Sequence, residues 1–187
     1  MSNAPIYLHL ATLTAPKTSL NAQGEIVYAI LKDEASTEVF FTLLENQGGS
    51  GYFGREIIPF ANIEACLNGV DLKQTIPAKR FLKAFTASRS VNNGGFLCAC
   101  LRHQGLLKPA PESPQQHVIG DDWAAWKAKM LETQSDKVYI TPDAEKPAKA
   151  EPASSKASDK KEKKQAKAKK EVAIPVGTEG DGNVDPA

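Results

Sequence analysis

The sequence predicts an α+β fold: a small antiparallel β-meander of about four strands, then three to four helices, then a disordered C-terminal tail. Three observations lead to this prediction. In the first 60 residues, one segment alternates apolar and polar residues with a period of two, and others are rich in β-branched and aromatic residues, as in strands. Further on, apolar residues recur at helical spacing. From residue 142 the chain has no aromatic residue and is rich in Lys, Ala and Pro, a composition that does not build a core.

These changes in composition also predict the domain boundaries. We expect one globular domain over 1–141, β-rich over 1–60 and helical over 61–141, followed by a Lys/Ala/Pro-rich tail over 142–187.

Four segments of the β-rich part have the composition of strands. Ile6, Leu8 and Leu10 alternate with polar or small neighbours. Segments 25–31 (EIVYAIL) and 38–44 (EVFFTLL) are rich in β-branched and aromatic residues and flank a polar turn, which predicts a hairpin. A glycine-rich turn then precedes a fourth expected strand over 52–60 (YFGREIIPF).

Helices are predicted from apolar stripes and from capping residues. The first covers 60–69, and the second covers 76–88, where Pro77 suits a helix start. The third runs over 93–103, with Asn92 or Asn93 as the expected N-cap and a glycine just past its end. Residues 106–116 are expected to be a linker, and the last helix, over 121–134, should pack its two tryptophans on the core.

The distribution of charge is more informative than the net charge of +1. Residues 1–71 carry three bases and eight acids, whereas residues 72–108 carry no acid and seven bases: Lys73, Lys79, Arg80, Lys83, Arg89, Arg102 and Lys108. In the tail, residues 156–170 contain eight lysines and two acids. Such a distribution predicts a basic face that meets phosphate or an acidic protein, although a solvated basic surface is the simpler alternative.

We expect the basic segment to contact nucleic acid. The helices over 78–87 and 93–103, joined by a short turn, have the layout of a helix-turn-helix, but glycines at the start of the second favour phosphate contact over base reading. The helix start at 92–95 is either an anion site or an ordinary cap. The candidate contact residues are Lys79, Arg80, Lys83, Arg89, Asn92, Asn93 and Arg102 in the domain and Lys160, Lys161, Lys163 and Lys164 in the tail.

No catalytic or metal-binding motif is predicted. Cys98, Cys100 and His103 resemble metal-ligand spacing, but helical residues two apart point about 200° from each other. A cysteine nucleophile beside His103 has no supporting signature, and no Walker sequence follows either glycine-rich stretch. Tyr52 and Phe53 could stack on unpaired bases, but we expect them to begin a strand and face the core.

The sequence therefore favours a non-enzymatic, nucleic-acid-binding accessory protein without cofactor or metal, with DNA preferred over RNA. The alternative is a protein–protein interaction module, an adaptor or inhibitor, that uses its polarised charge to meet an acidic protein or another copy of itself. A phosphate-handling or cysteine enzyme is a more distant hypothesis. Three cysteines, the absence of a signal-peptide pattern and the lack of a membrane-length apolar run predict a cytoplasmic protein with no membrane partner.

Overall fold

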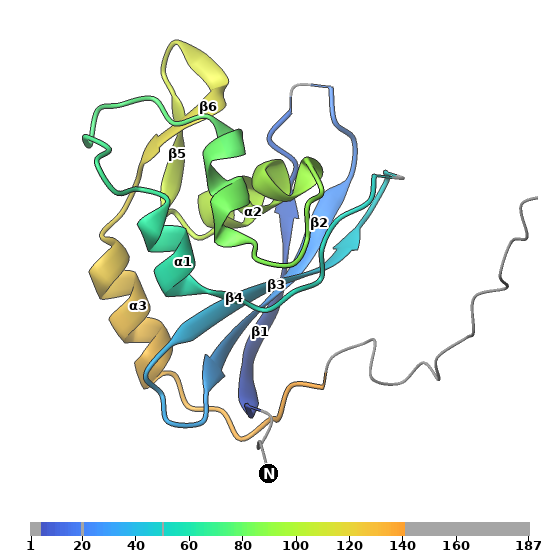
Figure 1. The fold of residues 1–187 in the computed structure, drawn as a ribbon, viewed down its shortest axis with the longest axis vertical. Helices are drawn as coiled ribbons and strands as arrows, with labels where there is room; N and C mark the ends of the chain where they lie inside the picture. Colours follow the sequence, from blue (N-terminus) through green and yellow to red (C-terminus); the bar gives the residue numbers. More distant parts are fainter. Residues whose placement is uncertain (1–4, 20, 50, 141–187) are drawn as a thin grey trace, which may run out of the picture. The chain divides into compact units, whose positions relative to one another are not determined.

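The structure is a computed structural model that describes residues 5–19, 21–49 and 51–140. By contacts between Cα atoms the chain divides into Met1–Pro147 and Ala148–Ala187, and all the described residues belong to the first unit. They confirm the α+β prediction. Strands β1 (Tyr7–Pro16), β2 (Glu25–Asp33), β3 (Val39–Asn46) and β4 (Ile58–Pro59) form an antiparallel sheet in the order β1-β2-β3-β4, the predicted meander (Figure 1).

The polar turn between β2 and β3 is built around the side chain of Asp33. Its carboxylate accepts hydrogen bonds from the backbone N–H groups of Thr37 and Glu38, at 2.7 and 2.8 Å, and from the Thr37 hydroxyl. Ser36 takes the left-handed conformation, with φ of 53°. This local bonding closes the hairpin that segments 25–31 and 38–44 were expected to form.

Helices cover one face of the sheet. α1 (Phe60–Ala65), the 3-10 helix η1 (Ala78–Ala84) and α2 (Asn92–His103) lie over it, and α2 packs between the sheet and η1 (Figure 1). The second expected helix is therefore a shorter and tighter one, which ends where Phe85 takes an extended conformation. Its apolar stripe is as expected, because Phe81 is fully buried and Phe85 is nearly so.

The last helix, α3 (Trp123–Glu132), is anchored by its two tryptophans as predicted. Trp123 and Trp126 stack on Phe60 and Phe41 with ring centroids 5.4 and 5.6 Å apart. Asp122 is the N-cap, and its carboxylate accepts from the backbone N–H groups of Ala124 and Ala125. Each buried aromatic contributes about 1.5–3 kcal/mol, so this short helix is fixed mainly by its packing.

The linker expected over 106–116 is wrong, because this segment forms most of a second antiparallel hairpin of β5 (Leu107–Ala110) and β6 (Ser113–Ile119). The prolines in this segment favoured a linker over a strand. Pro109 pairs with His117, whose backbone N–H and C=O both bond to Ile76 on the other side of β6. Pro109 therefore faces a position that requires no N–H donor, and the hairpin tolerates it.

The fourth strand is also shorter than the expected 52–60. Only Ile58 and Pro59 pair with β3. The backbone before them bonds to side chains instead: Tyr52 O accepts from the Ser90 hydroxyl and the Asn92 amide, and Arg55 O accepts from the Thr42 hydroxyl. Residues 52–57 are therefore a loop that lies against the start of α2.

A C-terminal segment pairs with the first strand. Leu8 and Val138 form an antiparallel bridge, His9 N–H donates to Lys137 O at 2.7 Å, and Tyr139 N–H donates to Tyr7 O at 2.7 Å. This segment covers the beginning of β1, which is otherwise an edge strand of the sheet.

Candidate nucleic-acid interface

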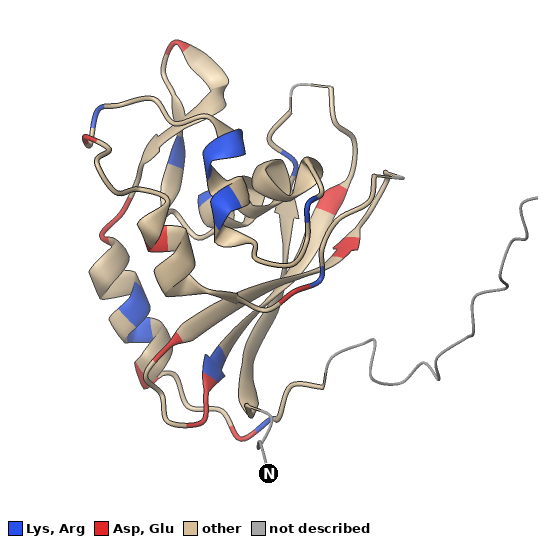
Figure 2. Ribbon diagram, viewed as in Figure 1, with Lys and Arg blue, Asp and Glu red and all other residues tan. Residues whose placement is uncertain are grey.

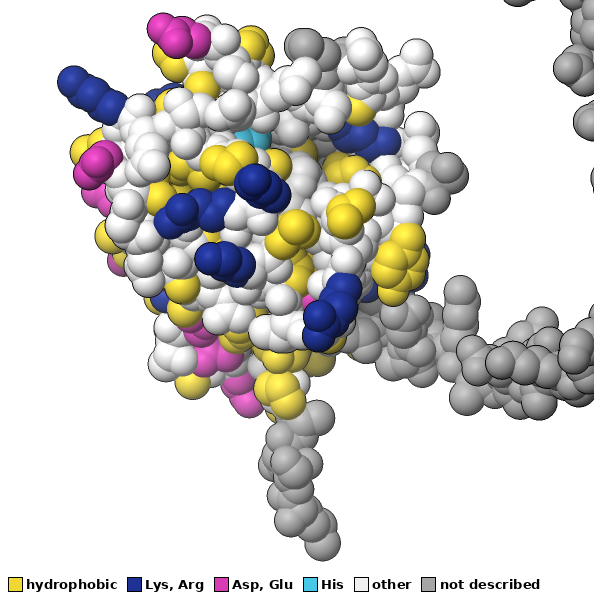
Figure 3. All heavy atoms as spheres, turned by 45° about the horizontal axis from the view of Figure 1, so that its top comes forward, with side chains coloured by type: hydrophobic (Ala, Val, Ile, Leu, Met, Phe, Trp, Pro, Cys, Tyr) yellow, Lys and Arg dark blue, Asp and Glu magenta, His cyan; other side chains and the backbone are white. Residues whose placement is uncertain are grey.

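Exposed cations gather on η1 and on the segments beside it. Lys73, Lys79, Lys83 and Arg89 are all exposed, and among the described residues none of them has a hydrogen-bond or ion-pair partner. Figure 2 shows the Lys and Arg positions along η1, and Figure 3 shows Lys and Arg side chains over the middle of this face, with Asp and Glu mostly toward its edge. We call these four residues the basic face.

Arg80 is not part of this face, although its neighbours in the sequence are. Its guanidinium donates through Nε to Cys66 O and through Nη2 to Asn68 O, the latter at 2.8 Å. These carbonyls follow α1, so Arg80 caps the end of that helix and links it to η1. Arg80 was predicted to contact nucleic acid, but its guanidinium N–H groups are used in hydrogen bonds within the domain.

Arg102 is similarly used inside the fold. Its Nε donates to His117 Nδ1 at 2.8 Å, and its Nη2 donates to Pro114 O and Gln116 O, both at 2.7 Å. It thereby fixes β6 to α2. The burial of His117 and the nearby Arg102 charge lower the pKa of this imidazole to about 4, so it stays neutral at pH 7 and accepts the guanidinium hydrogen bond.

The two asparagines begin α2, whose N-cap residue is Val91, and their side chains bind the 52–54 loop. Asn93 is fully buried; its amide accepts from Gly54 N–H at 2.9 Å and donates to the Ser88 hydroxyl at 2.9 Å. Asn92 is half-buried and donates to Tyr52 O at 3.0 Å. The N-cap expected at these residues is therefore wrong, and Asn93 offers nothing to solvent.

A protein carboxylate already fills the anion-binding turn just before α2. Glu56 accepts from the backbone N–H groups of Thr86, Ala87 and Ser88 at 3.1, 2.9 and 3.1 Å, and from the Thr86 hydroxyl at 3.0 Å. Burial alone would raise the pKa of Glu56, but these donors outweigh it and hold the pKa below its ordinary value. This turn has the geometry that favours an anion, and Glu56 is that anion.

α2 is not a recognition helix. Residues on both of its sides are buried, among them Leu97, Cys98, Ala99, Cys100 and Leu101, because it packs against both the sheet and η1. A helix enclosed in this way presents no face to a DNA groove, so the helix-turn-helix interpretation is wrong. Cys98 is fully buried.

The cysteines do not form a reactive or metal-binding cluster within residues 5–19, 21–49 and 51–140. All three are free and buried, and burial raises the pKa of each thiol. A reactive cysteine needs a thiolate, which this environment disfavours. In the same part of the chain, no three His, Cys, Asp or Glu side chains are placed to hold one metal ion.

The sequence interpretation missed a hollowed surface beside the basic face. Tyr52 is 76% exposed rather than facing the core. A hollow of about 310 Å³ is lined by Gly51, Tyr52, Phe53 and Arg55. Two more, of about 430 and 270 Å³, share Lys17, Ala22, Asn92 and Phe96, and Lys79 lines the smaller one. The exposed tyrosine after the glycine-rich turn was the available sequence signal.

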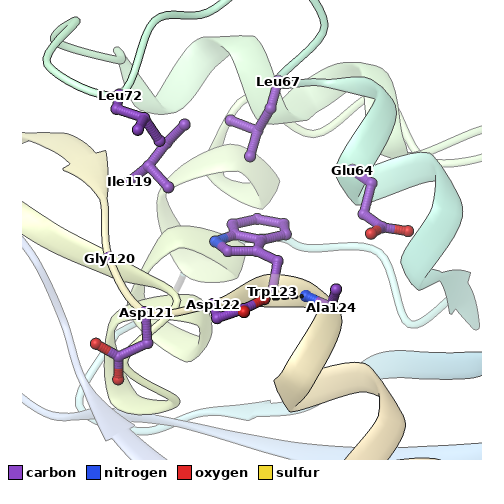
Figure 4. A pocket seen from close by; sticks show the side chains of 9 residues that line it. All are labelled: Glu64, Leu67, Leu72, Ile119, Gly120, Asp121, Asp122, Trp123 and Ala124. Atoms are coloured by element: carbon purple, nitrogen blue, oxygen red, sulfur yellow. Dashed lines mark hydrogen bonds between the residues drawn. The ribbon is translucent and has the colours of Figure 1, made fainter.

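A separate hollow of about 450 Å³ lies between α1, β6 and the start of α3. Figure 4 shows Leu67, Leu72, Ile119 and Trp123 directed toward one another around it. Leu72 is 75% exposed, and the lining also includes the acidic residues Glu64, Asp121 and Asp122. This is an apolar depression with an acidic rim.

The predicted tail contacts Lys160, Lys161, Lys163 and Lys164 lie outside the described residues. Comparison of the chain with models of protein families, with curated proteins and with solved structures gave no match. None of the described helices is long and apolar enough to span a membrane.

Proposed function

We propose that this chain is a non-enzymatic accessory protein that binds the phosphate backbone of nucleic acid through the basic face, with the tail lysines extending the contact. The observation that carries the proposal is that Lys79 and Lys83 on η1 and Arg89 between η1 and α2 are exposed and have no carboxylate partner among the described residues. When unpaired cations bind the phosphates of nucleic acid, they release the counterions that were condensed on it, which favours binding.

The expected binding is weak and strongly dependent on salt. Lys73 raises the number of available cations to four, and non-specific contacts of this kind give dissociation constants of roughly 10⁻⁴ to 10⁻⁶ M. The lysine-rich tail, attached to the same chain, would add phosphate contacts at high effective concentration. We expect DNA to be the preferred ligand over RNA.

The test is fluorescence anisotropy of labelled DNA and RNA with the full-length chain at about 50 and 200 mM salt. Lys79→Glu with Lys83→Glu should abolish measurable binding. The matched control is Lys129→Glu with Lys137→Glu, which makes the same charge change at exposed positions outside η1. Replacing Lys160, Lys161, Lys163 and Lys164 with Gln should weaken binding without abolishing it. Absent binding at low salt, or equal losses in the two double variants, would refute the proposal.

The hollow around Leu72 favours a second candidate function, a protein–protein interaction module. Its apolar lining suits a bulky side chain of a partner segment. Basic residues beside that side chain would replace Lys108 and Lys127 as the partners of Asp121 and Glu64 at the rim. Because the same chain carries a basic face, a second copy meets this description. Sedimentation without nucleic acid should then show a mass that rises with protein concentration, and Leu72→Glu should remove the rise. A constant monomer mass would exclude this self-association.

A further inference from the structure

Tyr52 lines the hollow beside Phe53 and Arg55, and hydrogen bonds hold its backbone in place. Its carbonyl accepts from the Ser90 hydroxyl at 2.5 Å and from the Asn92 amide at 3.0 Å, and Gly54 N–H donates to Asn93. The loop is thereby tied to α2 and to Ser90 just before it at Tyr52 and again at Gly54, while the Tyr52 ring itself is 76% exposed. A fixed backbone with an exposed aromatic ring forms a preorganised contact, since little entropy is lost when the ring is covered.

The hollow lined by Tyr52 connects to the basic face through two neighbouring hollows that share lining residues. Gly51 lines both the hollow beside Phe53 and Arg55 and the hollow beside Lys17 and Asn92. The latter shares its lining with the hollow that contains Lys79. A surface therefore runs from Arg55 past Tyr52 to η1.

Positive charge accompanies this path. Lys17 Nζ donates to Gln23 O and Gln47 O at 2.8 and 2.7 Å, which leaves one of its three donors. Lys79 stands farther along, exposed. The exposed acids Glu25 and Glu45, at the adjoining ends of β2 and β3, disfavour a phosphate path over the strands and leave the η1 side as the favourable one.

We infer that the ligand of this surface is single-stranded nucleic acid, with an unpaired base stacked on the Tyr52 ring and the neighbouring phosphates on Lys17, Lys79 and Lys83. This inference rests on the proposed function and specifies its ligand. In a duplex the base faces are already stacked on one another, so an aromatic side chain gains stacking energy only from unpaired bases. Contacts to phosphates alone would not distinguish single strands from duplexes in this way.

The test measures anisotropy of the full-length chain with labelled oligo-dT, oligo-U and a blunt duplex of the same length, at low salt. Tyr52→Ala and Tyr52→Leu should each weaken single-strand binding by roughly tenfold, within the range for one stacked base. Tyr52→Phe should retain the affinity, because it keeps the aromatic face that leucine lacks. Duplex affinity should be the same in all four proteins, and oligo-dT should bind more tightly than oligo-U if DNA is the preferred ligand.

The outcomes separate this inference from the proposed function. If Tyr52→Ala binds single strands as the wild type does, loses single-strand and duplex affinity equally, or is matched by Tyr52→Phe, the stacking inference is overturned. The proposed function survives in that case provided that Lys79→Glu with Lys83→Glu still abolishes binding. If the wild type binds none of the three ligands, both are overturned. Because the ring is mostly exposed, the variants should keep the wild-type circular dichroism and unfolding midpoint.

Discussion

Glu56 shows how one side chain joins two turns that are distant in the sequence. Its carboxylate bonds to three successive backbone N–H groups, those of Thr86, Ala87 and Ser88, which precede α2. No local pattern around Glu56 reveals this role, just as none reveals that Arg80 and Arg102 donate to backbone carbonyls of remote segments. The sequence identifies which residues can bond, but the partner of a long polar side chain depends on the completed fold.

Replacing Glu56 with Gln should destabilise the fold at neutral pH by about 1 kcal/mol, comparable to the loss of a helix cap, because an amide oxygen accepts less strongly and its NH₂ faces other donors. The folded pKa of Glu56 lies below its ordinary value of 4.5, so its contribution is present above that pH and is lost as the pH falls through the folded pKa. Urea unfolding should show a smaller difference in stability between wild type and variant at pH 3 than at pH 7. An equal gap at both values would contradict this account.

At the level of elements, the hydrophobic pattern was a good guide wherever side chains are buried on one face. The meander, the stripe of η1 and the tryptophans of α3 follow from it. The hydrophobic pattern failed where hydrogen bonds from the backbone to remote groups determine the local structure. The β5–β6 hairpin contains Pro109 because β6 bonds outward to Ile76, and residues 52–57 are not a strand because α2 side chains take their backbone groups. Neither arrangement is encoded by local composition.

Two adjacent glycines of α2 test how closely this helix packs on η1. A Cβ atom added at Gly94 would lie 2.4 Å from Ala78 O, whereas one added at Gly95 would have no neighbour within 4 Å. Gly94→Ala should therefore cost about 1–3 kcal/mol, as overpacking does. Gly95→Ala should be neutral or stabilising by up to about 1 kcal/mol, because alanine favours the helix. The unfolding midpoint should fall for Gly94→Ala and stay unchanged or rise for Gly95→Ala, and a similar destabilisation in both would contradict the close approach.

For the whole molecule, the sequence shows which segment carries the positive charge, but it does not show which of these bases are free to contact a ligand. Of the seven bases in 72–108, Arg80 and Arg102 bond to backbone carbonyls and Lys108 pairs with Asp121 at 2.9 Å. The other four bases, Lys73, Lys79, Lys83 and Arg89, form the basic face. The exposed Tyr52 and the hollows around it could not be derived from charge, because they result from how the 52–54 loop meets α2.

This division predicts two classes of variant. Lys83→Gln and Arg89→Gln should each reduce the slope of log K against log salt by roughly 0.7 for a single-stranded ligand, because each removes one phosphate contact. Arg80→Gln and Arg102→Gln should leave the slope unchanged and lower the unfolding midpoint instead, because they leave backbone carbonyls without donors. Anisotropy titrations at several salt concentrations, with thermal unfolding of the same samples, measure both quantities. A reduced slope in the Arg80 variant would show that its guanidinium reaches the ligand.

The pairing of residues 137–139 with the beginning of β1 bears on the order in which the chain matures during synthesis. The meander is made of contacts between neighbouring strands, so it can form as soon as residue 59 has left the ribosome. The outer edge of β1 then stays open until Val138 emerges, and an open edge can recruit a strand from another nascent chain. The interval between these two events is the period in which this protein is most exposed to misassembly, and a chaperone that shields a bare strand edge would act within it.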